Sequence, residues 1–433
     1  MSTENSNHAA QRPLKVVLLS HSDTLGGASV VTFRLMTALR NEGVDARMVV
    51  YTKATDSRYV TMLGTRGMRG FKFLLERMRI MLGNSFNRSD LFKVSIANVG
   101  FDVASHPWVR QADVIALNWI NQGMLSIKGI RELTRLGKPV VWTMHDMWCM
   151  TGICHHAYGC ELFREQCGCC PFLRSVNPND LSHKVWLRKE QLYNDSRITF
   201  VAVSNWLARK AAESSLLHNQ RVEVIPNAFP VENFLTKATH EVATFNIDYS
   251  RDLIVMGALR LDDPIKGFDI AIDALNHIFD NHPEVASRSM VIFFGDIRDR
   301  SLLDRLRFPY RHIGRVSDWK LLRQLYAAAK VVLSTSLFET LPGTLIEGQA
   351  SGCLPVTFGK GGQGDIVTRH LENGYIARYR DPEDVAHGII WALEQHPDTK
   401  ALHESVRERF SAESVARRYI ELFNELLKNQ SKS

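Results

Sequence analysis

The chain has 433 residues, of which 45% are apolar and 23% are charged, so it can bury large cores and does not have the composition of a disordered protein. Lysine and arginine total 53 against 46 acidic residues, and the charge of +7 favours a nucleic acid, an anionic membrane or a phosphorylated substrate as partner. No apolar run approaches the ~20 residues needed to cross a bilayer, and the polar start lacks the apolar core of a signal peptide. We expect a cytoplasmic protein of two or three domains, at roughly 150 residues per domain.

The first half of the chain alternates short apolar runs with segments of helical length. The run at 14–20 is followed by Gly26 and Gly27, by a helical pattern at 29–41 and by a second apolar run at 46–51. Further strand-like runs lie at 113–118, 139–144 and 198–203. This alternation predicts a parallel sheet covered by helices.

A second series of strand-like runs begins after residue 222. Its members lie at 253–259, 290–294, 311–313, 331–334 and 354–357. The predicted fold class is α/β, with two doubly wound Rossmann-like domains in tandem. We expect a first domain at 1–222 with a cysteine-rich insertion at 149–170, a second domain at 223–410, and a helical segment at 411–433 that returns to the first.

Two glutamates eight residues apart, Glu339 and Glu347, flank a glycine turn at Gly343. The pattern predicts a strand, a loop and a helix whose first turn presents free backbone N–H groups, which bind phosphate oxygens. Glu347, one turn into that helix, is placed to accept hydrogen bonds from two ribose hydroxyls. Two solvated glutamates beside an ordinary loop are the alternative for such a spacing in isolation.

Two cations follow the predicted strand that ends at Gly257. Arg260 and Lys266 flank a turn before the next helix, and cations at this edge of a parallel sheet can hold a diphosphate. The alternative is a pair of solvated surface cations. Fixed cations and helix-start amides would stabilise a departing diphosphate without a metal, and the Asp262-Asp263 pair between the cations fits a turn better than a metal site.

These motifs resemble the second domain of the retaining nucleotide-sugar glycosyltransferases of the GT-B fold, in family 4. The resemblance rests on the segments 257–260, 266–269, 226–229, 313–316, 339–347 and 352–356. In the first domain, Gly26-Gly27 and His145 also fall where that family has motifs. The chain departs from the family at Ala228, where glycine is usual, and at Leu341-Pro342, where an aromatic-glycine pair is usual. The resemblance implies two domains that face a central cleft.

The resemblance also implies roles for individual residues. His145, Glu339, Arg260 and Lys266 would act at the reacting centre, on the donor sugar and the leaving diphosphate. The donor would be bound by Gly26, Gly27, Gly257, Arg315, Val316, Gly343, Thr344, Leu345 and Glu347.

The implied activity is metal-independent transfer, with retention, from a UDP- or GDP-sugar to a saccharide or lipid-linked saccharide in cell-surface or exopolysaccharide assembly. A sugar-nucleotide epimerase of the same fold and a non-catalytic nucleotide-binding protein are the alternatives. We expect no nucleic-acid partner, because no recognised motif for one is present.

Six of the seven cysteines crowd into residues 149–170. Cys154, Cys160, Cys167 and Cys170 have the spacing C-x5-C-x6-C-x2-C, which could close a tetrahedral zinc site. A structural zinc, free or redox-labile thiols, and disulfides all stay open. The segment resembles a cysteine-rich insertion in family members that act in bacterial exopolysaccharide and colanic-acid-type assembly, and it should form one wall of the acceptor site.

The segment 64–82 interleaves cations with large apolar residues. The cations are Arg66, Arg69, Lys72, Arg77 and Arg79. This pattern predicts a helix that touches anionic lipid, and with it a peripheral position on the inner face of the membrane. A helix that packs its apolar side on the first domain and exposes its cations fits the same pattern.

Overall fold

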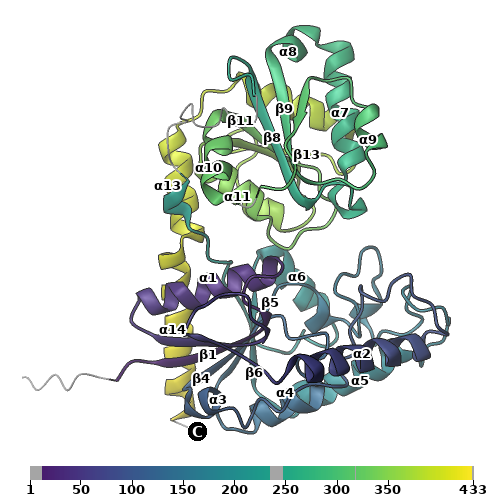
Figure 1. The fold of residues 1–433 in the computed structure, drawn as a ribbon, viewed down its shortest axis with the longest axis vertical. Helices are drawn as coiled ribbons and strands as arrows, with labels where there is room; N and C mark the ends of the chain where they lie inside the picture. Colours follow the sequence, from purple (N-terminus) through teal and green to yellow (C-terminus); the bar gives the residue numbers. More distant parts are fainter. Residues whose placement is uncertain (1–11, 235–246, 317, 432–433) are drawn as a thin grey trace, which may run out of the picture. The chain divides into compact units, whose positions relative to one another are not determined.

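The computed structural model describes residues 12–234, 247–316 and 318–431, and the chain divides into two compact units. Unit 1 comprises Met1–Val201, Ala211–Glu223 and Ala416–Ser433, and unit 2 comprises Ala202–Lys210 and Val224–Val415. Each unit is built on a sheet of its own (Figure 1). The domain boundaries expected at residues 222 and 410 stay a prediction.

Seven strands form the sheet of unit 1, in the order β3-β2-β1-β4-β5-β6-β7. They are β1 (Lys15–Ser22), β2 (Asp45–Thr52), β3 (Val60–Met62), β4 (Val114–Leu117), β5 (Val140–Met144), β6 (Ile198–Ala202) and β7 (Val222–Val224). From β3 to β5 the pairs are parallel, and Leu19 of β1 lies opposite both Val49 and Leu117. The strand order reverses between β1 and β4, and open sheets of this kind bind ligands at the carboxyl ends of such strands.

The helices of unit 1 pack on a sheet whose strands β4, β5 and β6 are buried at every residue. They are α1 (Gly27–Asn41), α2 (Arg66–Gly83), α3 (Pro107–Gln111), α4 (Ile127–Thr134), α5 (Leu181–Asn194) and α14 (Ala412–Gln430) from Ala416 onward, with short turns η1 (Trp148–Met150) and η2 (Leu162–Arg164). Helix α6 (Asn205–Glu213) has residues in both units. The Tyr419 hydroxyl of α14 is 2.9 Å from Thr143 Oγ1 of β5, and both residues are buried.

Six parallel strands form the sheet of unit 2, in the order β10-β9-β8-β11-β12-β13. They are β8 (Asp252–Arg260), β9 (Ser289–Asp296), β10 (Tyr310–His312), β11 (Ala329–Ser334), β12 (Leu354–Phe358) and β13 (Tyr375–Ala377). The helices are α7 (Phe268–Asn281), α8 (Pro283–Arg288), α9 (Ser301–Asp304), α10 (Trp319–Ala328), α11 (Gly343–Ala350), α12 (Pro382–Glu394) and α13 (Thr399–Phe410), with short turns η3 (Val231–Asn233), η5 (Pro264–Lys266) and η6 (Gly362–Asp365).

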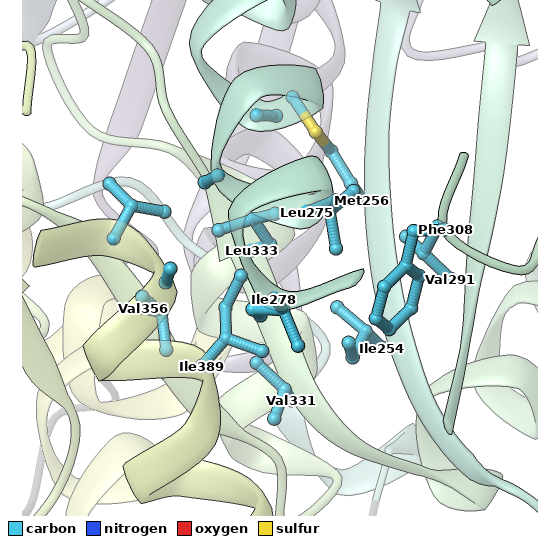
Figure 2. Close-up of a cluster of buried hydrophobic side chains, with 14 of the residues drawn as sticks. Ile254, Met256, Leu275, Ile278, Val291, Phe308, Val331, Leu333, Val356 and Ile389 are labelled. Atoms are coloured by element: carbon cyan, nitrogen blue, oxygen red, sulfur yellow. The ribbon is translucent and has the colours of Figure 1, made fainter. Parts of the chain in front are cut away.

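The core of unit 2 lies between the sheet and the helix pair α7 and α12. Ile254, Val331 and Val356 from three neighbouring strands meet Ile278 of α7 and Ile389 of α12, as Figure 2 shows. All five side chains are fully buried, which explains why these strands read as continuous apolar runs. The packing fixes the carboxyl ends of β8 and β11, where the motifs of this unit lie.

The predicted strands of both series are confirmed, and a helix, α14, occupies most of the segment 411–433 that was predicted to be helical. Strands β3, β7 and β13 were not among the predicted runs; each has three residues and lies at a sheet edge, although β10, of the same length and also at an edge, was predicted. Within the described ranges, no helix is both long and apolar enough to span a bilayer.

Candidate functional site

The motifs of unit 2 meet where β8 and β11 end side by side. The loops that follow the two strands are bonded to each other, because Leu337 N donates to Ile265 O and Thr335 Oγ1 donates to Gly267 O, each at 2.8 Å. Gly267 has a φ of 59°, and a Cβ there would lie 2.3 Å from Thr335 O. Only glycine fits this junction without displacing the second loop.

Lys266 and Glu339 form an ion pair across this junction, with the ammonium nitrogen in direct contact with Glu339 Oε1. Their side chains are 26% and 19% exposed, so solvent reaches both partners. The family resemblance implies separate roles for the two residues toward one donor, and the structure brings them together. Each partner neutralises the other in the absence of a ligand.

Helix α11 begins beside this pair. Its N-cap residue is Pro342, and among the described residues no side chain makes a capping hydrogen bond to the first-turn amides of Gly343, Thr344 and Leu345. A Cβ on Gly343 would lie 2.9 Å from the Phe229 ring, so this glycine lets the two segments approach. Leu345 is fully buried and can contribute to a ligand site only through its backbone.

Arg260, at the end of β8, has acidic partners of its own. Its guanidinium lies 3.0 Å from Asp263 Oδ2 and its Nε lies 3.6 Å from Asp262 Oδ1. The predicted turn at Asp262-Asp263 therefore also compensates this cation. Its side chain is 32% exposed, which leaves part of the guanidinium open to a ligand.

The other predicted donor residues of unit 2 lie further from this junction or have a packing role. A Cβ on Gly257 would lie 1.8 Å from the Phe294 ring, so close packing of strands β8 and β9 requires this glycine. Arg315 and Val316 follow β10, two strands away from β8, and Arg315 is paired with Asp296 at 2.6 Å.

In unit 1, the predicted glycines lie at the start of α1. Gly26 has a φ of 89° and Gly27 is the first helical residue, and no side chain caps this helix either. A Cβ on either residue would meet nothing within 4 Å. The positive φ thus explains why residue 26 is a glycine, whereas packing does not require a glycine at position 26 or 27.

His145 follows β5 at the carboxyl edge of the same sheet. Its Nε2 lies 3.1 Å from Oδ1 of Asn118, which follows β4. Burial lowers the pKa of His145 to about 4, although the negative charge of Asp146 partly raises it. The imidazole is therefore neutral near pH 7.

The next residue, Asp146, is the centre of a buried network. Its carboxylate accepts hydrogen bonds from Trp119 Nε1 at 2.9 Å and from His155 Nδ1 at 2.6 Å, and His155 Nε2 lies 3.0 Å from Ser95 Oγ. Burial raises the pKa of Asp146, but the charge and hydrogen bond of His155 outweigh it and lower the pKa to about 2. The order Ser95-His155-Asp146 matches that of a hydrolase triad, yet Ser95 is 0% exposed and no substrate reaches its hydroxyl. The network therefore positions Trp119 instead.

Aromatic rings line the same edge of the sheet. His21, from β1, stacks on Tyr51 of β2 with ring centroids 4.7 Å apart and meets the edge of Trp119 at 5.4 Å. Burial lowers the pKa of His21 to about 4, so it too is neutral near pH 7. Trp119 and His145 remain partly exposed at this edge.

A buried lysine that was not predicted holds the start of the cysteine-rich segment. Lys189 of α5 donates to Trp148 O at 2.5 Å and to Thr151 O at 2.9 Å, and its ammonium lies 3.3 Å from the centre of the Trp148 ring. Burial lowers the pKa of this lysine to about 7. Ser95 and Lys189 were missed because 38 to 60 positions separate them from their partners, whereas His155 lies only nine positions from Asp146. The His155-His156 pair beside Cys154 was the one visible signal.

The four predicted zinc ligands line one cavity of about 20 Å³. Gly152 N donates to Cys167 Sγ at 3.2 Å, and burial raises the pKa of Cys167 to about 11 and of Cys170 to about 12. All seven cysteines lie in the described part of the chain and are free thiols. No three of the four sulfur atoms lie within 4.8 Å of one another. Among the described residues, His277, Glu383 and His387 do have ligand atoms that all lie within this distance.

Helix α2, which carries the cations of the segment 64–82, matches neither the membrane-facing helix nor the helix with exposed cations that the sequence predicts. The prediction that Arg77 faces a membrane is wrong, because Arg77 is 3% exposed and pairs with the fully buried Glu76 at 3.2 Å. Lys72 donates to Gly100 O at 2.7 Å, and Arg69 donates to Leu63 O at 3.1 Å. Large apolar side chains of α2 are exposed instead: Met68, Phe71, Leu74, Met78 and Leu82.

Two family descriptions match the chain over most of its length. "Glycosyltransferase Family 4" matches residues 25–233, and "Glycosyl transferases group 1" matches residues 250–395. The chain is a glycosyltransferase of the group 1/family 4 kind. The two matched regions contain the predicted motifs of units 1 and 2.

Curated relatives of this glycosyltransferase match it over parts of their length. The phosphatidylinositol N-acetylglucosaminyltransferase gpi3 subunit of Schizosaccharomyces pombe is 24% identical over 52% of this chain and 48% of the relative. The putative colanic acid biosynthesis glycosyl transferase WcaC of Escherichia coli K12 is 33% identical over 21% of this chain and 23% of the relative. The chain thus spans about half or less of the length of these relatives.

Solved structures share the fold over nearly the whole chain. Anabaena Alr3699/HepE in complex with UDP and glucose aligns with a TM-score of 0.60 at 17% identity, covering 95% of this chain and 99% of that one. WaaG, a glycosyltransferase involved in lipopolysaccharide biosynthesis, aligns with a TM-score of 0.60 at 13% identity, covering 94% and 99%. The predicted GT-B fold class is confirmed.

Proposed function

We propose that this glycosyltransferase moves a sugar from a UDP- or GDP-sugar to a saccharide or lipid-linked saccharide, with retention, in cell-surface or exopolysaccharide assembly. Unit 2 binds the donor and unit 1 binds the acceptor. The observation that carries the proposal is the Lys266–Glu339 pair beside the uncapped start of α11. A diphosphate brings the negative charge that both Lys266 and the first-turn amides can bind.

Donor binding replaces the internal ion pair. The diphosphate takes Glu339's place as the partner of Lys266, and Glu339 turns to the hydroxyls of the transferred sugar. Arg260, held by two aspartates, approaches the same diphosphate, and Glu347 accepts from the ribose hydroxyls. Such charge-assisted hydrogen bonds are each worth about 1.5–3 kcal/mol.

The reaction breaks the bond between the anomeric carbon and the diphosphate oxygen and forms a bond from that carbon to the acceptor oxygen. The acceptor attacks the face that the diphosphate leaves, and the leaving phosphate takes the acceptor proton. Lys266 and the α11 amides stabilise the charge that develops on the phosphate, without a metal ion. His145, neutral near pH 7, adds no positive charge beside the cationic sugar and can exchange hydrogen bonds with it.

A donor screen tests this proposal. Thermal shifts with UDP-, GDP- and ADP-sugars identify the nucleotide, and nucleoside diphosphate release is then followed with and without saccharide acceptors. We expect release to depend on acceptor and to be lost in Glu347→Ala but retained in the surface variant Lys320→Ala. Equal conversion of the donor without any acceptor would instead identify an epimerase, and donor binding without turnover would identify a non-catalytic binding protein.

We also infer that α2 contacts an anionic membrane surface. Met68, Phe71, Leu74, Met78 and Leu82 recur every three or four residues and are 44–66% exposed, which places them on one face of the helix. Arg66 and Arg79, both exposed, remain available to anionic headgroups. A contiguous apolar face with cations beside it is typical of helices that lie in a membrane interface. Sedimentation with anionic vesicles at low salt tests this, and no co-sedimentation would reject it.

We further propose a structural zinc ion at the four-cysteine cavity. The support is that Cys154, Cys160, Cys167 and Cys170 line one small space and that a backbone amide already donates to one sulfur. A bound zinc ion would draw the four sulfur atoms inward until each lies at the ~2.3 Å Zn–S distance of a thiolate site. Metal analysis of protein purified without added zinc should find about one equivalent that Cys154→Ser removes. Less than half an equivalent would leave free thiols or disulfides, which thiol titration tells apart.

A further inference from the structure

Three metal-binding side chains converge on the helix pair that covers the sheet of unit 2. His277 lies on α7, and Glu383 and His387 lie four residues apart on α12, so that both face the same side of their helix. One ligand atom from each of the three lies within 4.8 Å of the other two. The rings of His277 and His387 meet edge to face with centroids 6.3 Å apart.

These three side chains have no hydrogen-bond or ion-pair partner among the described residues, whereas three other acids on the same two helices do. Asp273 pairs with Arg305 at 2.8 Å, Asp280 pairs with Arg307 at 2.5 Å, and Asp384 accepts from Tyr375 Oη at 2.9 Å. The carboxylate of Glu383 is thus left beside two imidazoles, whereas Arg305 and Arg307 pair with other acids.

We propose that His277, Glu383 and His387 bind a divalent transition-metal ion such as zinc. Two imidazole nitrogens and one carboxylate oxygen are a donor set that zinc takes, with water in the fourth position. Ligand atoms in a tetrahedral zinc shell lie about 3.4 Å apart, given Zn–N bonds of ~2.0–2.1 Å. The side chains need to close by little more than 1 Å from the observed limit, and Glu383 and His387 are exposed and free to turn.

The ion would join α7 to α12 at the protein surface. Helix α7 begins directly after Gly267, the residue that follows Lys266, and α12 packs against α7 over the core shown in Figure 2. A bound ion would therefore stabilise the helix pair that supports the loop of Lys266. This site is separate from the cysteine cavity, which lies in unit 1, and does not depend on the proposed transferase activity.

Metal titration of the full chain without a histidine tag tests the site. After EDTA treatment and dialysis, Co²⁺ is added, and weak visible bands report nitrogen and oxygen ligands whereas intense near-ultraviolet absorption reports thiolates. We expect one ion of the first kind, and calorimetry with Zn²⁺ in the Cys154→Ser background should show affinity at least tenfold weaker in His277→Ala, His387→Ala and Glu383→Gln. His282→Ala is the matched control, because its ring lies 6.4 Å from that of His277 but outside the set.

A second measurement separates lost binding from lost folding. In a Cys154→Ser background, which removes the proposed cysteine site, Zn²⁺ should raise the melting temperature of the protein and of its His282→Ala variant but not that of its His387→Ala variant, and circular dichroism should show that all of them are folded. Unchanged Zn²⁺ affinity in His387→Ala, or no binding of the nitrogen and oxygen kind below 1 mM Co²⁺ or Zn²⁺, would overturn the proposal.

Discussion

Replacing either partner of the Lys266–Glu339 pair should change donor binding in opposite ways. Lys266→Met removes the cation and keeps the length of the side chain, whereas Glu339→Gln removes the charge that neutralises Lys266 in the free protein. With side chains 26% and 19% exposed, the pair itself contributes about 1 kcal/mol or less to the stability of unit 2. Both variants should therefore fold, and their effects should be read in ligand binding.

The magnitudes follow from the contacts that each variant loses. A charge-assisted hydrogen bond to a diphosphate is worth about 1.5–3 kcal/mol, so Lys266→Met should weaken binding of the nucleoside diphosphate by a factor of roughly 10 to 150. Glu339→Gln loses no contact to the diphosphate and frees Lys266, so it should bind the nucleoside diphosphate as tightly as the parent or up to about tenfold more tightly. It should lose the additional affinity that the sugar provides.

Calorimetry with UDP and UDP-glucose, or with the base that the donor screen selects, measures both effects. Lys320→Met, an exposed lysine on α10, is the matched control and should bind like the parent protein. The reasoning would be refuted if Lys266→Met bound the nucleoside diphosphate within twofold of the parent, or if Glu339→Gln weakened nucleoside diphosphate and nucleotide sugar equally.

Three further predictions concern unit 1. His145 and His21 have pKa values lowered to about 4 in the folded chain, below the ordinary value near 6.5, so the unfolded chain takes up their protons first; the stability that they contribute should fall as pH drops from 6.5 to 4, by up to about 3 kcal/mol per histidine in acid-unfolding curves, and His21→Gln should flatten that fall. Lys189→Met leaves two buried carbonyl groups unpaired and should lower the free energy of unfolding by about 2–4 kcal/mol in urea denaturation, whereas exposed Lys184→Met should change it by less than about 0.5 kcal/mol. Phe71→Ser with Leu74→Ser should weaken vesicle binding at least tenfold without lowering the melting temperature, and Phe279→Ser on α7 is the exposed control; unchanged sedimentation would place the membrane contact elsewhere.

The strands and the donor loop could be predicted because their signals are local. A strand buried on both faces is a continuous apolar run, as Val16 to Leu19 is, and Lys266, Gly267 and Gly343 sit in short motifs around the strand ends. The partnership of Lys266 with Glu339 could not be read this way, because 73 residues separate them and only the pairing of β8 with β11 brings the loops together.

The buried network of unit 1 was beyond prediction for the same reason. Ser95 lies in an irregular segment, and its role is seen only in its contacts: its hydroxyl bonds His155 and accepts from Arg77 at 3.4 Å, and its carbonyl accepts from Trp148 Nε1 at 2.8 Å. Arg77 was misplaced because an isolated cation is usually solvated. The burial of Arg77 depends on its ion pair with Glu76. Neighbouring residues of a helix do not face each other as residues three or four apart do, so the sequence does not indicate this pair.

The same pair explains why α2 exposes its apolar side. Glu76 Oε1 accepts from Ile96 N at 2.9 Å and from Ala97 N at 3.0 Å, and Arg77 donates to Val94 O at 3.0 Å, so polar bonds anchor the helix to the segment at 94–97. Since the helix is held by its charges, Phe71 and Leu74 are not needed for packing on unit 1. Exposed apolar area of this kind lowers solubility unless something covers it. The buried charge pair that holds the helix and the large apolar side chains turned outward therefore support the membrane contact proposed for α2.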